Sequence, residues 1–157
     1  MNLWHPDLLL ARARVLEALA ARVSEPPFRA FVPLEHGVGY DDGAGDHAML
    51  VWVGGLALLK AFDHESPVSR DARDDQQPDP ALTDGLPEAL GPVLDGLEGE
   101  DRTFVAWFAD GAWTVRGEPF PADRFLLDGE GAAEWLLDEG FRADPEVLER
   151  ALAGAVP

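Results

Sequence analysis

The segment from Phe62 to Pro67 contains the densest group of chemically capable side chains in this 157-residue chain. Asp63, His64 and Glu65 follow one another there. Carboxylates and imidazoles bind divalent metal ions, and a histidine can also act as a general base. In an extended strand, however, the two carboxylates would share one face and His64 would point to the other. The residues before the apolar run that starts at position 48 offer further ligands, namely His36, Asp41, Asp42, Asp46 and His47.

Two interpretations of this segment follow from its residue types. In the first, the backbone turns and Asp63, His64 and Glu65 hold a divalent metal, as in a metal-binding protein or a metal-dependent hydrolase. In the second, the segment is a turn that side-chain to backbone hydrogen bonds stabilise, and Ser66-Pro67 is typical of such a turn. The sequence leaves both interpretations open.

A β-hairpin is predicted over residues 48–62, directly before this segment. Two apolar runs flank Gly54-Gly55, and a pair of glycines is typical of a two-residue hairpin turn. If Val53 pairs with Leu56, both faces of the hairpin are apolar, and we expect both to be covered. The same register pairs Trp52 with Ala57 and Leu50 with Leu59.

A second hairpin is predicted over residues 103–116, with its turn at positions 110–111, which are Asp-Gly. One face of this hairpin is mixed, because Trp107 and Arg116 lie there beside threonines. Trp107 is therefore either a core residue or an aromatic contact for a partner, and we expect Trp107 and Arg116 to be central contacts of a partner surface. The opposite face is wholly apolar and consists of Phe104, Ala106, Phe108, Trp113 and Val115.

Helical periodicity predicts three helices around these hairpins. The first covers residues 6–23 and begins with a proline, which suits the first helical position. Two short helices are expected at 131–139 and 145–153. Residues 28–47 are expected to be irregular, because four glycines interrupt them. We therefore predict one α+β domain over residues 1–157, with an antiparallel sheet built from the two hairpins and packed against an N-terminal helix and two C-terminal helices.

A long polar connection, residues 63–101, joins the two hairpins. Connections of this length are usually functional or disordered. Its middle part, residues 68–82, is rich in Asp, Gln and Pro, and we expect a flexible acidic loop there. A short helix is expected between residues 87 and 97.

Negative charge is concentrated in this connection. The chain has 30 acidic and 12 basic residues, a net charge of −18. Residues 1–60 contribute −2, residues 61–100 contribute −9 and residues 101–157 contribute −7. Such a surface repels nucleic acid and anionic lipid and attracts a cationic partner, so we expect a basic protein as the partner. The carboxylates expected to steer it are Asp71, Asp74, Asp75 and Asp79.

Composition narrows the alternatives. The chain has no cysteine, which excludes disulfides and thiolate metal sites and is compatible with the cytoplasm. The N-terminal residues lack the pattern of a signal peptide, and no apolar run approaches 18 residues. Nucleotide-binding glycine motifs, a G-x-S-x-G motif and H-E-x-x-H are all missing, which favours a binding protein over an enzyme. Two alternatives stay open: adaptation of the acidic surface to high salt, and a homodimer formed through the Trp107 face.

The string from Phe62 to Ser66, with Ser69 and the later Thr103, Phe104 and Trp107, resembles an FDHES-type motif followed by a TFxxW strand in small uncharacterised bacterial proteins. Some of these proteins resemble the immunity proteins of polymorphic toxins. The resemblance covers about a third of the chain, and Arg70 stands where the pattern has a proline. It implies an immunity-type protein that neutralises a toxin, and it assigns no activity and no catalytic residue.

Overall fold

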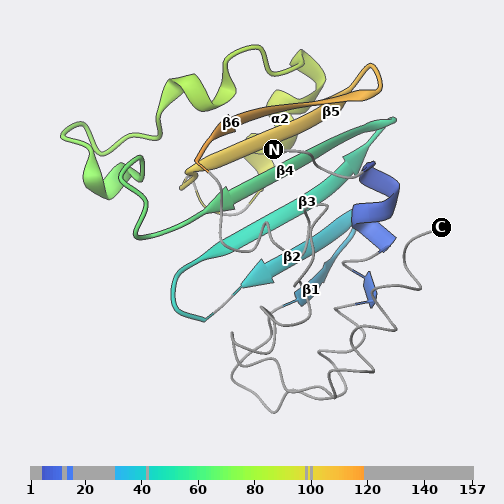
Figure 1. Cartoon of the computed structure of the whole chain (residues 1–157), viewed down its shortest axis with the longest axis horizontal. Helices are drawn as coiled ribbons and strands as arrows, with labels where there is room; N and C mark the ends of the chain where they lie inside the picture. Colours follow the sequence, from blue (N-terminus) through green and yellow to red (C-terminus); the bar gives the residue numbers. More distant parts are fainter. Residues whose placement is uncertain are drawn as a thin grey trace.

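The structure, a computed structural model, describes residues 5–11, 14–15, 31–41, 43–97, 99 and 101–118. Six strands form one antiparallel sheet in which every strand pairs with its neighbours in sequence (Figure 1). With the helices around it, the sheet gives the predicted α+β class. The strands are β1 Phe31–Leu34, β2 Gly37–Asp41, β3 His47–Val53, β4 Leu56–Phe62, β5 Phe104–Ala109 and β6 Ala112–Gly117.

Both predicted hairpins are confirmed in their register. β3 and β4 pair Val53 with Leu56, and β5 and β6 pair Phe108 with Trp113. Each two-residue turn has positive φ angles at both central positions, which is the type I′ geometry that follows the twist of the strands. Alternating side chains and turn residues therefore determine these pairings locally.

The prediction of an irregular segment over residues 28–47 is wrong for β1 and β2. β2 lies between β1 and β3 as an ordinary paired strand, and Gly37 lies opposite Val51. A Cβ atom on Gly37 would overlap the carbonyl oxygen of Leu50. The glycine therefore permits a close approach of two strands, which the sequence pattern does not distinguish from a loop.

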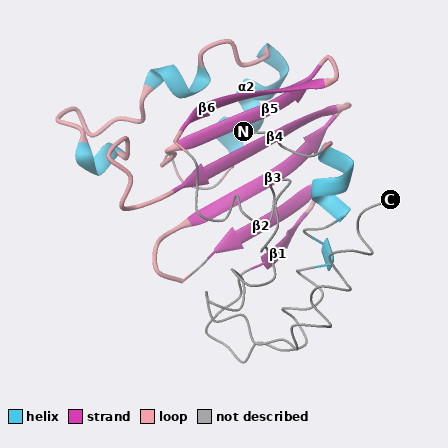
Figure 2. Cartoon of the chain, viewed as in Figure 1, coloured by secondary structure: helices cyan, strands magenta, loops and turns pink. Residues whose placement is uncertain are grey.

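The long connection covers one face of the sheet. It contains three 3₁₀ helices, η1 Arg70–Ala72, η2 Pro80–Thr83 and η3 Glu88–Leu90, and the predicted short helix, α2 Gly91–Gly96. Figure 2 shows these as short helical turns joined by loops. Together with the sheet, η2, η3 and α2 bury one apolar cluster that comprises Val51, Leu58, Leu82, Leu90, Leu94, Val105 and Trp107.

The opposite face of the sheet is also buried, with Leu59 and Phe104 almost inaccessible. The predicted N-terminal helix is confirmed over residues 6–11 and 14–15. The His5 ring, just before this helix, lies 5.0 Å from that of Phe108, between centroids. The remainder of the predicted helix and both predicted C-terminal helices lie outside the described residues.

Candidate functional site

The register of the β3–β4 hairpin places Asp46 beside Asp63. The last pair of this hairpin is His47 with Phe62. Asp46 immediately precedes His47 and Asp63 immediately follows Phe62, so the two carboxylates lie opposite each other where the strands separate. An antiparallel hairpin therefore unites residues that are far apart in the chain.

His64 joins the two carboxylates through the turn that follows β4. Its Nδ1 atom lies 2.6 Å from Asp46 Oδ1, and its backbone N–H donates to the same oxygen at 2.9 Å. The ligand atoms of Asp46, Asp63 and His64 all lie within 4.8 Å of one another. The Asp46 side chain is 14% exposed and that of His64 is 46% exposed, so the group opens to solvent through the imidazole.

Gly45 allows the loop before β3 to approach this imidazole. Its φ of +123° lies in a region that residues with a side chain rarely adopt. A Cβ atom at this position would lie 3.6 Å from the His64 ring, which is an ordinary contact distance, so the φ angle and not the available space favours glycine here. The conformation of Gly45 thus sets the path of the chain into Asp46.

The turn after β4 has the hydrogen bonds expected from its residue types. Asp63 Oδ1 accepts from the Glu65 N–H at 2.8 Å, and the Asp63 N–H donates to Thr103 Oγ1 at 3.0 Å. The Ser66 N–H donates to the Asp63 carbonyl at 3.2 Å. Asp63 therefore stabilises the turn and also belongs to the group of potential ligands.

The structure brings together two members of the predicted ligand set of Asp63, His64 and Glu65. Glu65 is exposed and is not a member of the described cluster, whose third member is Asp46. The hairpin register, which is readable from the sequence, was the signal that could have selected Asp46.

The other potential ligands that precede β3 have different surroundings. His36 Nε2 lies 3.7 Å from Glu35 Oε1 at the surface, and the His47 ring packs against Phe62 at 5.3 Å between centroids. Asp41 Oδ1 accepts from the Gly43 N–H at 2.7 Å. Asp42 lies outside the described residues.

The electrostatics of the cluster favour a protonated histidine. The hydrogen bond to Asp46 raises the pKa of His64 above its usual value, and the negative charges of Asp46, Glu65 and Asp63 act in the same direction. A divalent metal would therefore compete with a proton for this imidazole. The arrangement can hold a proton on His64 to a higher pH than an isolated imidazole would, or bind a cation through one nitrogen and two carboxylates.

The four predicted steering carboxylates differ in their surroundings. Asp71 and Asp74 are exposed, and Asp74 forms no ion pair with any described residue. Asp75 accepts two hydrogen bonds from Arg73, which lowers the pKa of its carboxyl group below the usual value. Asp79 caps η2 by accepting from the Ala81 N–H at 3.0 Å. Only part of the negative charge of this acidic run therefore lacks an arginine or a backbone N–H as its partner.

The expectation that Trp107 faces a partner is wrong. Trp107 is 3% exposed and belongs to the cluster beneath the connection. The Arg116 guanidinium carbon lies 5.5 Å from the Trp107 ring centroid, and its Nε–H donates to the Asp84 carbonyl at 3.2 Å. These two residues hold the connection against the sheet, so a segment of the same chain occupies the place expected for a partner or a second copy.

Comparison with known proteins leaves function to be argued from geometry. No protein family model, no characterised protein and no solved structure matches the chain. Among the residues that the structure describes, no helix is both long enough and apolar enough to cross a membrane. The arrangement of side chains therefore carries the functional argument.

Proposed function

We propose that this protein is an acidic protein-binding module whose long connection receives a basic segment of a partner. The observation that carries the proposal is the negative charge of the layer, by which we mean residues 63–97 of the connection, over one face of the sheet. Residues 63–97 contain nine carboxylates and two arginines. Opposite charges across an interface speed association and disfavour wrong partners.

The layer also has a defined shape. Leu82, Leu90 and Leu94 anchor the connection in the apolar cluster, while Asp71, Asp74 and Asp75 remain exposed. Restricting a segment before it binds lowers the conformational entropy that binding costs, and the leucine anchors restrict the part of the connection that follows the exposed carboxylates. The flexibility expected for residues 68–82 stays a prediction.

The partner that fits this layer is a protein with a basic surface. A toxin that acts on nucleic acid has such a surface, since it must itself attract phosphate groups. An immunity-type role, in which the acidic layer blocks the basic site of a toxin, is the form of the proposal that the FDHES-type resemblance favours.

Capture from native lysate tests this proposal. The tagged protein is washed at rising salt, and the bound proteins are identified by mass spectrometry. We expect one basic protein to elute at moderate salt, because screening weakens surface charge interactions. Replacing Asp71, Asp74, Asp75 and Asp79 by asparagine should then slow association with the purified partner.

A matched control removes the same charge elsewhere. Asp7, Glu35, Asp110 and Glu118 are exposed and lie outside the connection. Their replacement by the corresponding amides should change association less than the four changes in the acidic run. Equal slowing by both variants would contradict a binding surface on the connection and would indicate only an effect of net charge.

The Asp46–Asp63–His64 cluster supports a second candidate function, binding of a divalent metal. Three protein ligands with an exposed side leave room for a water molecule or a substrate, as in hydrolytic metal sites. Purified protein titrated with Zn²⁺ or Mn²⁺ should bind one equivalent, and His64→Ala and Asp46→Asn should abolish binding. His36→Ala is the control, and its loss of the same equivalent would contradict this site.

A further inference from the structure

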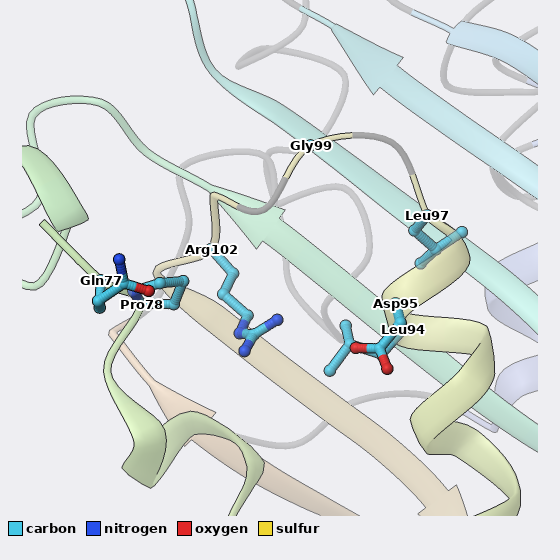
Figure 3. A pocket seen from close by; sticks show the side chains of 7 residues that line it. All are labelled: Gln77, Pro78, Leu94, Asp95, Leu97, Gly99 and Arg102. Carbon is cyan, nitrogen blue, oxygen red and sulfur yellow. The ribbon is translucent and has the colours of Figure 1, made fainter.

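A cavity of about 460 Å³ lies within the connection, between residues 77–78, the end of α2 and Arg102, which directly follows the connection. Figure 3 shows the Arg102 side chain pointing into the space between Gln77 and Pro78 on one side and Leu94 and Asp95 on the other. The volume lies within the range of small-molecule sites. The cavity is lined by Gln77, Pro78, Leu94, Asp95, Leu97, Gly99 and Arg102.

Arg102 supplies the positive charge among the side chains that line this cavity. Its Nε atom is buried and has no hydrogen-bond partner, and the described residues include no ion pair to it. By contrast, Arg70 Nε lies 2.7 Å from Asp101 Oδ1, and Arg73 is paired with Asp75. A buried polar group without a partner is costly, so the Nε–H of Arg102 suits an acceptor that the described residues do not supply.

A second cation lies behind the same wall of the cavity. Lys60 on β4 is 1% exposed, and its ammonium donates a hydrogen bond to the carbonyl oxygen of Gly99, a residue that lines the cavity. Burial lowers the pKa of Lys60 below the usual value, and the charge of Arg102 lowers it further. Asp101 acts in the opposite direction, but its carboxylate is already paired with Arg70.

Two cationic side chains, Arg102 and Lys60, thus lie close to this cavity in a chain whose net charge is −18. A planar guanidinium binds a carboxylate or phosphate through two parallel hydrogen bonds. Apolar walls beside it come from Pro78, Leu94 and Leu97. The carboxylate of Asp95, also at the cavity, disfavours ligands with several negative charges.

We propose that the cavity binds a small organic anion whose single oxyanion group, a carboxylate or a phosphate, pairs with Arg102 while its apolar part lies against Pro78, Leu94 and Leu97. This ligand differs in charge from the basic partner proposed for the acidic layer. The two proposals therefore do not depend on each other.

The test uses the full chain, with benzoate and inorganic phosphate as probes, each up to about 10 mM, which exceeds the Kd of a millimolar site. Two-dimensional ¹H–¹⁵N NMR follows the Nε–H signal of Arg102, and thermal unfolding follows the stability of the protein. We expect a saturable shift of that signal and a rise in Tm with benzoate. Arg102→Gln should weaken binding at least tenfold, and Arg102→Lys should weaken it less, because one charge remains without the planar fork.

Arg73→Gln is the matched control, because Arg73 lies on the same layer with its own carboxylate partners. It should leave probe binding unchanged. Binding of benzoate but not phosphate supports a carboxylate ligand, and the reverse supports a phosphate ligand. If neither probe moves the Arg102 signal, or if Arg73→Gln weakens binding as much as Arg102→Gln, the proposal is overturned.

Discussion

The Nδ1 atom of His64 lies 2.6 Å from Asp46 Oδ1, although 18 positions separate the two residues in the sequence. The same carboxylate oxygen accepts the backbone N–H of His64 at 2.9 Å. Both the ring and the backbone of the histidine are therefore held by one aspartate, which fixes the turn after β4 against the loop before β3. This relationship makes Asp46 the central residue of the cluster.

His64 should titrate above the usual histidine pKa, because Asp46 favours its charged form. The stabilisation that this pair supplies is present below the unfolded-state pKa and is lost as the pH rises through the higher folded-state pKa. Histidine NMR titration measures the pKa directly. Asp46→Asn should lower the pKa of His64 toward its usual value. An unchanged titration in that variant would show that Asp46 is not the cause.

Trp107→Ala should destabilise the protein by about 3–5 kcal/mol, because the ring fills the space between β5 and the connection. Urea unfolding measures the loss. Trp113→Ala is the matched control on β6, and its effect should be smaller because Trp113 is only partly buried. If the two variants lose equal stability, Trp107 does not have the special packing role assigned to it.

Lys60→Met should flatten the pH dependence of stability at alkaline pH. Because burial lowers the folded-state pKa of Lys60, the unfolded state binds more protons between the two pKa values. The wild-type protein should therefore gain stability as the pH rises through the folded-state pKa toward the usual lysine value. Urea unfolding at pH 7 and at alkaline pH, compared between wild type and variant, measures this difference. Equal slopes would mean that the ammonium is not desolvated.

Asp79→Ala should cost about 1 kcal/mol, since its side chain caps η2 by accepting the Ala81 N–H. Asp74→Ala should leave the unfolding midpoint almost unchanged, because Asp74 is exposed and caps no helix. Chemical denaturation of both variants compares a structural carboxylate with one that is free to steer a partner. A larger loss for Asp74→Ala than for Asp79→Ala would reverse this assignment.

Local sequence patterns were sufficient for the two hairpins and for part of the cluster. Alternating apolar residues and the two-residue turns set the β3–β4 register, and that register places Asp46 opposite Asp63. The strand β2 was not recognised from the sequence, because its glycines are typical of a loop. One of them, Gly37, is needed for the close approach of two strands. Glu65 was expected to join Asp63 and His64 if the backbone turned; the backbone does turn, and Glu65 is exposed and lies outside the cluster.

What the sequence alone determined is the short-range part of this protein: which strands form hairpins, where they turn, and where negative charge accumulates. Tertiary structure decided which surfaces meet. Trp107 and Arg116 lie on a mixed face that suits a partner or a segment of the same chain equally well, and the packing of Leu82 and Leu90 onto it selects the segment. The cavity at Arg102 likewise exists only after α2 has packed. Pairing within a hairpin depends on near neighbours, whereas the covering of a face depends on residues distant in the chain, and no local pattern encodes that choice.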